Sequence, residues 1–323
     1  MKALIYNTFG KPDVLEWKTD WPDPVPGPKA MKIKVAAGSV NPKDVLLRKG
    51  KFSKTLARTP LPRISGMDIA GEVVEIGTHV THFKVGDPIF GMTNEFSGGL
   101  HSQYALLDEN EANLVPKGIS LEDAAAVPLS AQTALQALRD LCGLEPDQRI
   151  LINGASGGVG HFAIQIAKTM GAEVHAVCGA HHRDFVQSMG ADHIHHYETH
   201  APTSIKVRFH AVFDVFGNLN RRMMKNQLKP GAIFVSTVPR AATLMAEFRA
   251  RVGLGKTSRL VEVQSRRKDL EQIGQWIAQG QLSPHIHRIY PPEQAREAHR
   301  QMETKHTTGK IILSFLRENV EAV

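Results

Sequence analysis

The chain has 323 residues, enough for two domains of ordinary size, and its 42% hydrophobic and 22% charged residues exclude an intrinsically disordered protein. Two cysteines are too few for a disulfide framework or a cysteine-rich metal site. The net charge of +7 comes from scattered residues without interleaved aromatic side chains, so nucleic acid is not expected as a partner. No apolar run approaches the roughly 18 residues of a membrane span, so a membrane is not expected either.

The first third of the chain predicts short strands with many turn residues. Residues Met1 to Tyr6 lack the long apolar core of a secretory signal, which favours a cytoplasmic location. Residues Met31–Ala37 alternate in polarity, Ile69–Ile76 are rich in β-branched side chains, and Val85–Phe90 follow after a loop. The prolines between Pro22 and Pro28 indicate a surface connection after an opening hairpin. Together these features predict a compact β-rich module.

The most informative motif is a strand that runs into a glycine-rich turn and then a helix. After a helical stretch from Leu121 to Leu141, broken at Pro128, the apolar strand Arg149–Asn153 leads into Gly154, Ala155, Ser156, Gly157, Gly158, Val159 and Gly160. Apolar residues then recur at helical spacing up to Met170, which predicts a helix with one buried stripe. Gly154 or Gly157 would permit the sharp turn, and Gly160 would allow the helix to pack closely on the sheet. The arrangement suits a nucleotide pyrophosphate, with an ordinary turn as the alternative.

The next strand indicates which dinucleotide the fold takes. Enzymes that use NAD usually place an Asp or Glu about 20 residues beyond the glycines, to bind the ribose hydroxyls. No acidic residue occurs from His175 to Arg183, where the chain reads Cys178, Gly179, Ala180, His181, His182 and Arg183. Cations at the start of a helix oppose its dipole, so they indicate an anionic partner such as the 2′-phosphate of NADPH. NADPH is therefore the predicted cofactor, and a solvated helix start with surface histidines is the alternative.

Strands and helices alternate through the rest of the chain. Four further strands are predicted, at His193–Tyr197, Ala211–Phe216, Ala232–Val238 and Leu260–Val263. The stretch Ala241–Gly255 is interpreted as a helix and loop insertion. The tail adds a helix at Asp269–Gln279, a strand at His285–Tyr290, a helix at Pro292–Met302 and a strand at Lys310–Phe315. This alternation predicts an α/β fold in which a parallel, doubly wound sheet follows the β-rich module.

Several histidines gather near the strand at His193–Tyr197. A metal site needs ligands that converge in space. Alternation along a strand places His193 and His195 on one face and His196 on the other, so these histidines do not close around an ion. No metal site is predicted.

Five segments carry a family resemblance when they are taken jointly and in order: Gly38–Asp44, Gly66–Gly71, Val85–Asp87, Gly154–Gly160 and Gly309–Leu313. With them the chain resembles the zinc-independent quinone oxidoreductases of the medium-chain dehydrogenase/reductase superfamily. The resemblance implies a GroES-like catalytic domain over residues 1–122, a Rossmann NADPH-binding domain over residues 123–265, and a segment, residues 266–323, that returns to the catalytic domain. It also implies a homodimer.

The resemblance further implies that catalytic zinc is absent. Zinc alcohol dehydrogenases of the superfamily carry a Cys where this chain has Asn41, and Gly-His-Glu where it has Gly66-Met67-Asp68. A catalytic zinc needs three protein ligands, and too few are left. No cysteine precedes Cys142, so the four-cysteine structural lobe is missing too. Without a metal to polarise a carbonyl, electron-poor acceptors are the easier substrates.

By resemblance, Asn41 and Thr133 are the catalytic candidates beside the nicotinamide, where the Asn41 amide could donate to the acceptor oxygen. The alternative for Asn41 is a loop residue that caps its own turn, and the alternative for Thr133 is a helix residue without a catalytic role. Asp44 is expected to cap the helix that follows. Tyr197 matches a tyrosine near the adenosine phosphate, with an exposed strand-end aromatic as the alternative. Ligands bind at the ends of strands in doubly wound sheets, so the strand-end residues are candidates for binding the cofactor, with apolar core residues as the alternative. These candidates are Phe216, Gly217, Thr237 and Val238.

These features predict an NADPH-dependent enzyme that transfers a hydride to quinones or α,β-unsaturated carbonyls, with water as the proton source. Enoyl-thioester reductases of the superfamily use a tyrosine as proton donor in the turns after Asp44, whereas Val45–Phe52 contains none. An enoyl-thioester or enone reductase is the first alternative function. A non-catalytic NADPH-binding protein with protein or RNA partners is the second.

Overall fold

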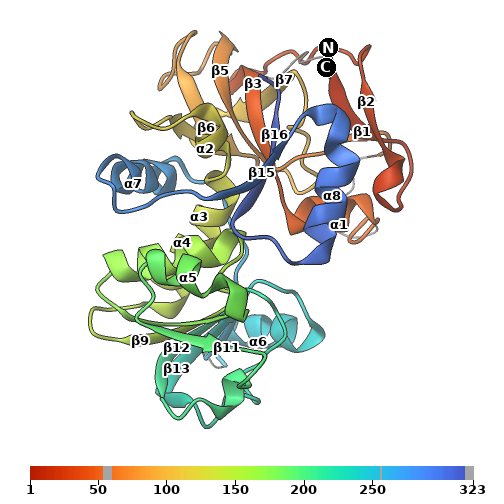
Figure 1. The fold of residues 1–323 in the computed structure, drawn as a ribbon. Coiled ribbons are helices and arrows are strands. Elements are labelled where there is room, and N and C mark those ends of the chain that lie inside the picture. Colours follow the sequence, from red (N-terminus) through yellow and green to blue (C-terminus); the bar gives the residue numbers. More distant parts are fainter. Residues whose placement is uncertain (54–59, 255–256, 317–323) are drawn as a thin grey trace. The chain divides into compact units, whose positions relative to one another are not determined.

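The computed structural model describes residues 1–53, 60–254 and 257–316, which form two compact units (Figure 1). The first unit consists of Met1–Leu129, Gln264–Gly280 and the chain from Pro284 onward. The second consists of Ser130–Val263 and Gln281–Ser283. Among the described residues, no helix is long and apolar enough to cross a membrane.

The first unit is the β-rich part of the chain. Its seven-stranded sheet has the order β15 (Ile286–Tyr290), β16 (Lys310–Ser314), β3 (Ala30–Val40), β5 (Asp68–Ile76), β6 (Pro88–Met92) and β8 (Ala112–Leu114), with β7 (Tyr104–Asp108) paired to β3. A three-stranded sheet has the order β2 (Leu15–Lys18), β1 (Ala3–Tyr6) and β4 (Arg63–Ile64). The predicted alternation is confirmed in β3, where Met31, Ile33 and Val35 are buried and Lys34 is exposed.

The C-terminal strand β16 completes the seven-stranded sheet, in which it lies between β15 and β3 (Figure 1). Residues Ile311–Ser314 pair antiparallel with Val40–Ala37. This pairing brings Lys310, the first residue of β16, to the end of β3, where Asn41 precedes a helix. The helices of this unit are α1 (Pro42–Arg48), α2 (Leu121–Ala125), α7 (Arg267–Ala278) and α8 (Ala295–Thr304).

The second unit is built on a six-stranded sheet in which every pairing is parallel. Its order is β11 (His193–His196), β10 (Glu173–Cys178), β9 (Arg149–Asn153), β12 (Phe209–Asp214), β13 (Leu228–Ser236) and β14 (Ser258–Leu260). The helices are α4 (Gly158–Thr169), α5 (Arg183–Ser188) and α6 (Ala241–Arg251), together with a π-helix (Gln136–Cys142) and α3 (Pro128–Leu135), which contains the boundary between the units. The predicted α/β class with a doubly wound sheet is confirmed.

The order of the strands marks where a ligand can bind. Strands β10 and β11 lie on one side of β9, and the next strand in the sequence, β12, lies on the other. The chain therefore changes direction across the sheet between β9 and β12. In doubly wound sheets, ligands bind beyond the carboxyl ends of the strands at this topological switch point.

Helix α4 is buried on more sides than its predicted single stripe implies. All residues from Gly160 to Ala167 are buried, and they include His161 and Gln165. Gln165 Nε2 donates to the carbonyl of Ser283 (3.0 Å), and Gln165 Oε1 accepts from the N–H of Ser283 (2.8 Å). A segment distant in sequence thus supplies the hydrogen bonds that allow a polar side chain to be buried here.

The helix predicted within Ala241–Gly255 is confirmed as α6, but it is not an insertion, while Gly255 lies outside the described residues. Helix α6 connects β13 to β14, as a crossover helix of the doubly wound sheet does. Glu247 of α6 binds the guanidinium of Arg259 through both carboxylate oxygens (2.9 and 3.1 Å) and accepts from the N–H of Leu260 (3.1 Å). These contacts hold the edge strand β14 to the helix.

Candidate active site

The glycine-rich turn leaves β9 with a backbone that only glycine adopts readily. Gly154 has a φ of +87°, and the N–H groups of Gly154 and Ala155 both donate to the carbonyl of Val177 (3.2 and 3.0 Å). Gly157 has a φ of −78°, which any residue can take. Of the two glycines predicted to permit the turn, Gly154 is therefore the one whose conformation requires it.

Gly160 provides the close approach between helix and turn. A Cβ atom built on Gly160 would lie 2.2 Å from the carbonyl oxygen of Gly154 and 2.7 Å from the backbone of Ala155. Helix α4 begins at Gly158, with Gly157 as its N-cap. The first N–H groups of a helix have no acceptor within the helix and carry its positive dipole end, so this turn presents donors suited to an anion.

The residues predicted to select the cofactor follow β10. Cys178 ends the strand, Gly179 precedes a short 3-10 turn, and Arg183 begins α5 with an exposed side chain. Tyr197 follows β11, where its N–H donates to the carbonyl of Cys178 (3.3 Å). His182 is the N-cap of α5. These predicted residues gather at the carboxyl ends of β10 and β11.

The sequence interpretation missed an acidic residue at this place. Glu198 Oε1 accepts from the N–H of Ala180 (3.2 Å), although the two residues are 18 positions apart. Burial raises the pKa of Cys178 to about 11, and there Glu198 raises it further while Arg183 opposes the shift. Glu198 lies beyond Arg183 in the sequence, but the parallel pairing of β10 with β11 places the residues after both strands side by side.

A buried polar network closes the switch point, and the sequence analysis missed it as well. The Asn153 amide, at the end of β9, donates to Asp214 Oδ1 and to Asn218 Oδ1 (both 2.7 Å). The Asp214 carboxylate, at the end of β12, accepts from the N–H groups of Gly217 and Leu219 (both 2.9 Å). Burial raises the pKa of Asp214. Polar residues that end two otherwise apolar strands are the sequence signal for this network.

The remaining predicted strand-end residues lie at the same edge of the sheet. Phe216 is 48% exposed, and a Cβ on Gly154 would lie 3.1 Å from it. A Cβ on Gly217 would lie 2.2 Å from the Val238 side chain, and Thr237 Oγ1 donates to the carbonyl of Val215 (2.9 Å). The structure thus brings the ends of β9, β12 and β13 together.

The two predicted catalytic residues belong to different units, Asn41 to the first and Thr133 to the second, where it is buried in α3. Asn41 is 1% exposed, and its amide is fully engaged. Nδ2 donates to Asp68 Oδ1 (2.8 Å) and to the carbonyl of Ser39 (3.0 Å), and Oδ1 accepts from Lys310 Nζ (2.6 Å). Donation to a substrate oxygen would require the amide to release one of these acceptors.

Asp44 and Lys310 add charge to this buried network. Asp44 Oδ2 accepts from the N–H of Asn41 (2.8 Å), which is the predicted capping role at the start of α1. Burial, reinforced by the charge of Asp68, raises the pKa of Asp44 to about 7. Burial lowers the pKa of Lys310, while Asp68 and Asp44 oppose that shift. The Lys310 ammonium lies 3.9 Å from the Asp68 carboxylate.

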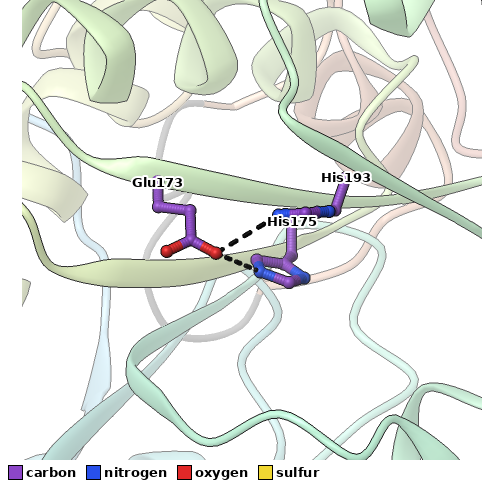
Figure 2. A group of neighbouring side chains, drawn as sticks. All are labelled: Glu173, His175 and His193. Carbon is purple, nitrogen blue, oxygen red and sulfur yellow. Dashed lines mark hydrogen bonds and ion pairs between the residues drawn. The ribbon is translucent and has the colours of Figure 1, made fainter.

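The histidine of β11 nearest its start has metal-ligating neighbours on β10, which the prediction of no metal site did not take into account. In the second unit, Glu173 and His175 of β10 come together with His193 of β11, and the candidate ligand atoms of the three residues lie within 4.8 Å of one another (Figure 2). Alternation within β11 alone places His193 and His195 on one face and His196 on the other. The register of the neighbouring strand β10 additionally places His175 beside His193.

Comparisons with known proteins give the family. The alcohol dehydrogenase GroES-like domain matches residues 27–117, and the zinc-binding dehydrogenase domain matches residues 189–313. The chain is 31% identical to the chloroplast envelope quinone oxidoreductase homolog of Arabidopsis thaliana, over 97% of this chain and 98% of the relative. It is 29% identical to the mitochondrial NAD(P)H oxidoreductase RTN4IP1 of Danio rerio, over 99% of this chain and 93% of the relative.

A solved structure agrees with these matches. The quinone oxidoreductase from Coxiella burnetii superposes with a TM-score of 0.88 at 29% identity, covering 97% of this chain and 99% of that one. The proteins of this family are oxidoreductases that bind a nicotinamide cofactor. On the strength of the near full-length match to the Arabidopsis relative, the chain belongs to the quinone oxidoreductase family of the medium-chain dehydrogenase/reductases.

Proposed function

We propose that this oxidoreductase uses NADPH to reduce quinones or α,β-unsaturated carbonyls. The observation that carries the proposal is the switch-point edge of the second unit, where the Gly154 turn, the start of α4 and the ends of β12 and β13 converge. The relatives described above, a quinone oxidoreductase homolog and an NAD(P)H oxidoreductase, support the same class of reaction. When bound, the reduced nicotinamide supplies the hydride.

The residues of this edge fit a dinucleotide. The backbone N–H groups of Gly158, Val159 and Gly160 begin α4 and suit the pyrophosphate, because the first N–H groups of a helix have no acceptor within it. The Gly157 N–H donates to the carbonyl of Gly154 within the turn (3.3 Å). Cys178, Gly179 and Tyr197 are assigned to the adenosine end, with Arg183 as the cation and His182 as a hydrogen-bonding partner for a 2′-phosphate. The strand-end residues assigned to the nicotinamide half are Phe216, Gly217, Thr237 and Val238.

The residues around Asn41 do not fit the zinc ion named in the description of the matched dehydrogenase domain. The Asn41 oxygen accepts from the Lys310 ammonium (2.6 Å), so a positive charge already occupies the polar centre of this network. Met67, fully buried, offers a thioether where an imidazole or carboxylate would be needed. Acceptors that spread developing negative charge by conjugation therefore suit this chain better than simple ketones.

Arg183→Ala is expected to raise the KM for NADPH about 10- to 100-fold, the cost of one charge-assisted hydrogen bond to phosphate, and to leave the KM for NADH nearly unchanged. Glu198→Gln removes the negative charge near the same place and is expected to lower the KM for NADPH about 2- to 5-fold. Steady-state kinetics with both coenzymes measure the two effects. Arg208→Ala, an exposed arginine just before β12, is the matched control. Equal effects of Arg183→Ala on both coenzymes would remove the proposed phosphate contact.

The substrate class is tested by NADPH oxidation with three acceptors: a simple benzoquinone, an unsaturated aldehyde and a crotonyl thioester. Turnover with the first two and little with the third is the expected result, because Val45–Phe52 provides no phenol as proton donor. Faster turnover of the thioester would favour an enoyl-thioester reductase. Binding of NADPH without oxidation on any acceptor, together with salt-dependent binding of RNA, would favour the non-catalytic alternative.

A further inference from the structure

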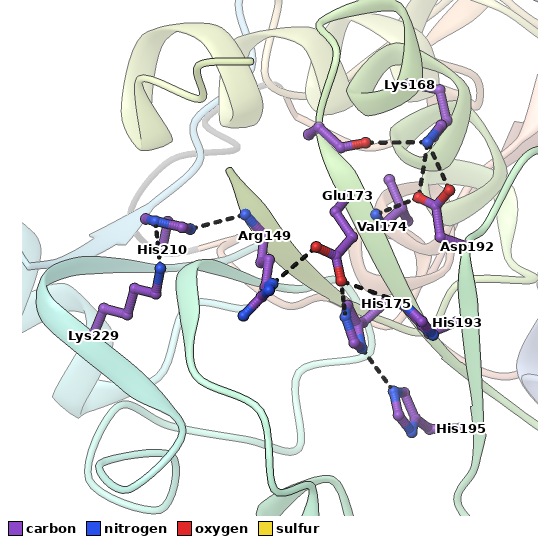
Figure 3. Close-up of polar contacts among 11 residues, drawn as sticks. Arg149, Lys168, Glu173, Val174, His175, Asp192, His193, His195, His210 and Lys229 are labelled. Carbon is purple, nitrogen blue, oxygen red and sulfur yellow. Dashed lines mark hydrogen bonds and ion pairs between the residues drawn. The ribbon is translucent and has the colours of Figure 1, made fainter. Parts of the chain in front are cut away.

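A group of side chains that could hold a metal ion lies at the start of β10 and β11 in the second unit (Figures 2 and 3). Glu173 begins β10, and Cys178, at the dinucleotide edge, ends it. A strand rises about 3.3 Å per residue, so about 16 Å separate Glu173 from Cys178 and about 10 Å separate His175 from it. The group is therefore distinct from the site assigned to the cofactor.

The sheet itself brings these three side chains together. Glu173 and His175 are two positions apart on β10, so they emerge on the same face. Parallel pairing places His193 of β11 directly beside His175. Glu173 Oε1 consequently lies 3.1 Å from His175 Nε2 and 3.3 Å from His193 Nε2.

These separations match a compact metal site. Ligands of a tetrahedral zinc, each about 2.0–2.1 Å from the ion, lie about 3.3–3.5 Å from one another. The two oxygen–nitrogen separations are close to this value, and all three ligand atoms are within 4.8 Å of one another. The His193 side chain is 53% exposed, so it has room to rotate toward an ion, and it leaves solvent access for a water ligand.

The residues around the group hold the ligands in place. Arg149 Nε donates to Glu173 Oε2 (2.8 Å), so the other oxygen, Oε1, is the one turned toward the histidines. His175 Nδ1 is hydrogen-bonded to His195 Nε2 (3.0 Å), which leaves His175 Nε2 for coordination. Outer contacts of this kind fix the orientation and tautomer of metal ligands.

A hydrogen bond between the residues before and within the paired strands supports the register of β10 and β11. Asp192, just before β11, accepts from the N–H of Val174 (2.7 Å), the residue between Glu173 and His175 (Figure 3). Lys168 Nζ binds both oxygens of the same carboxylate (2.8 Å each). The ligands are thus preorganised on adjacent strands, which lowers the entropy that binding an ion would cost.

We propose that Glu173, His175 and His193 bind one divalent transition-metal ion of the zinc class, with water completing its coordination, and that the ion clamps the edge strand β11 to β10. Two imidazoles and one carboxylate are a ligand set that zinc takes in proteins. Nearby Arg149 adds positive charge, so we expect micromolar affinity. The alternative is a hydrogen-bonded cluster that holds no ion.

The proposal is tested by titrating the untagged, chelator-treated full chain with Zn²⁺ against a colorimetric indicator, and with Co²⁺ followed by visible absorption. We expect one equivalent of Zn²⁺ at micromolar affinity and the intense bands of four-coordinate Co²⁺. His193→Ala, at an exposed position, is expected to weaken binding at least ~100-fold, and His195→Ala about 10- to 100-fold. His306→Ala, an exposed histidine of the first unit, is the matched control and should bind as the parent chain does.

Zinc should also raise the thermal midpoint of the second unit in the parent chain and not in His193→Ala. Glu173→Gln keeps the size of the side chain and removes its charge, so it provides a second variant, with circular dichroism to verify its fold. Binding that is undetectable in the parent chain, or equal in the parent, His193→Ala and Glu173→Gln, would overturn the proposal. These outcomes are independent of the coenzyme and acceptor assays.

Discussion

Replacing Lys310 with methionine is expected to lower the free energy of unfolding of the first unit by about 3–5 kcal/mol. Lys310 is 2% exposed, and its ammonium donates to Asn41 Oδ1 and lies 3.9 Å from Asp68. Methionine fills a similar volume but removes the cation, which leaves the buried carboxylate of Asp68 without its nearby positive charge and raises the pKa of Asp44 further. Leaving a buried charge without its counterion costs far more than breaking an ion pair at the surface.

Tryptophan fluorescence during urea unfolding measures this effect selectively. All three tryptophans, Trp17, Trp21 and Trp276, belong to the first unit. Lys117→Met, at an exposed position in the same unit, is the matched control and should change stability by less than about 0.5 kcal/mol.

A double-mutant cycle separates the charge from the packing around it. Adding Asp68→Asn to Lys310→Met should recover about 1–3 kcal/mol relative to the sum of the two single changes, because the ionised partner is then gone as well. A Lys310→Met variant as stable as Lys117→Met would show that the buried ammonium does not compensate the two carboxylates.

Gly160→Ala is expected to destabilise the second unit by about 1–3 kcal/mol and to weaken coenzyme binding about 100-fold. The added Cβ would lie 2.2 Å from the carbonyl oxygen of Gly154, a distance that only a shift of the backbone can relieve. Because both residues belong to the turn and helix start assigned to the pyrophosphate, the shift would misplace the donors. Calorimetric titration with NADPH and thermal unfolding followed by circular dichroism measure the two effects.

Gly157→Ala is the matched control for the steric argument. Its Cβ would lie 3.5 Å from the same carbonyl oxygen, an ordinary contact, and its φ of −78° suits alanine. The stability of this variant should stay within about 0.5 kcal/mol of the parent. If the two alanine variants lost the same stability, close approach at Gly160 would not be the cause.

The fold class and the position of the glycine-rich turn could be predicted because each rests on local sequence. The strand at Arg149–Asn153 and the glycines after it are contiguous, and their conformations follow from nearest neighbours. The confusion of α6 with an insertion arose because its pattern alone does not reveal that Glu247 binds Arg259 on the adjacent strand.

The parts that escaped prediction depend on pairing between distant segments. Glu198 reaches Ala180 because β11 lies beside β10, and the same pairing joins His193 to Glu173. Lys310 meets Asn41 across 269 positions. The separation of two residues in the sequence does not predict that they lie side by side, because the register of the strands in the sheet determines which residues are neighbours.

The return of the chain to the first unit at β16 imposes an order on folding during synthesis. The ribosome completes Ser130–Val263 before it makes Lys310, so the doubly wound unit can collapse while the other sheet still lacks β15 and β16. Until then Ala37–Val40 of β3 lack the strand that later pairs with them, although Ala30–Lys34 already pair with β7, and Asp68 and Asp44 lack the nearby Lys310 ammonium. The β-rich unit therefore depends on Lys310, which is synthesised more than 200 residues after Asp68 and Asp44. The two acidic side chains can be buried next to a positive charge only when Lys310 has been made.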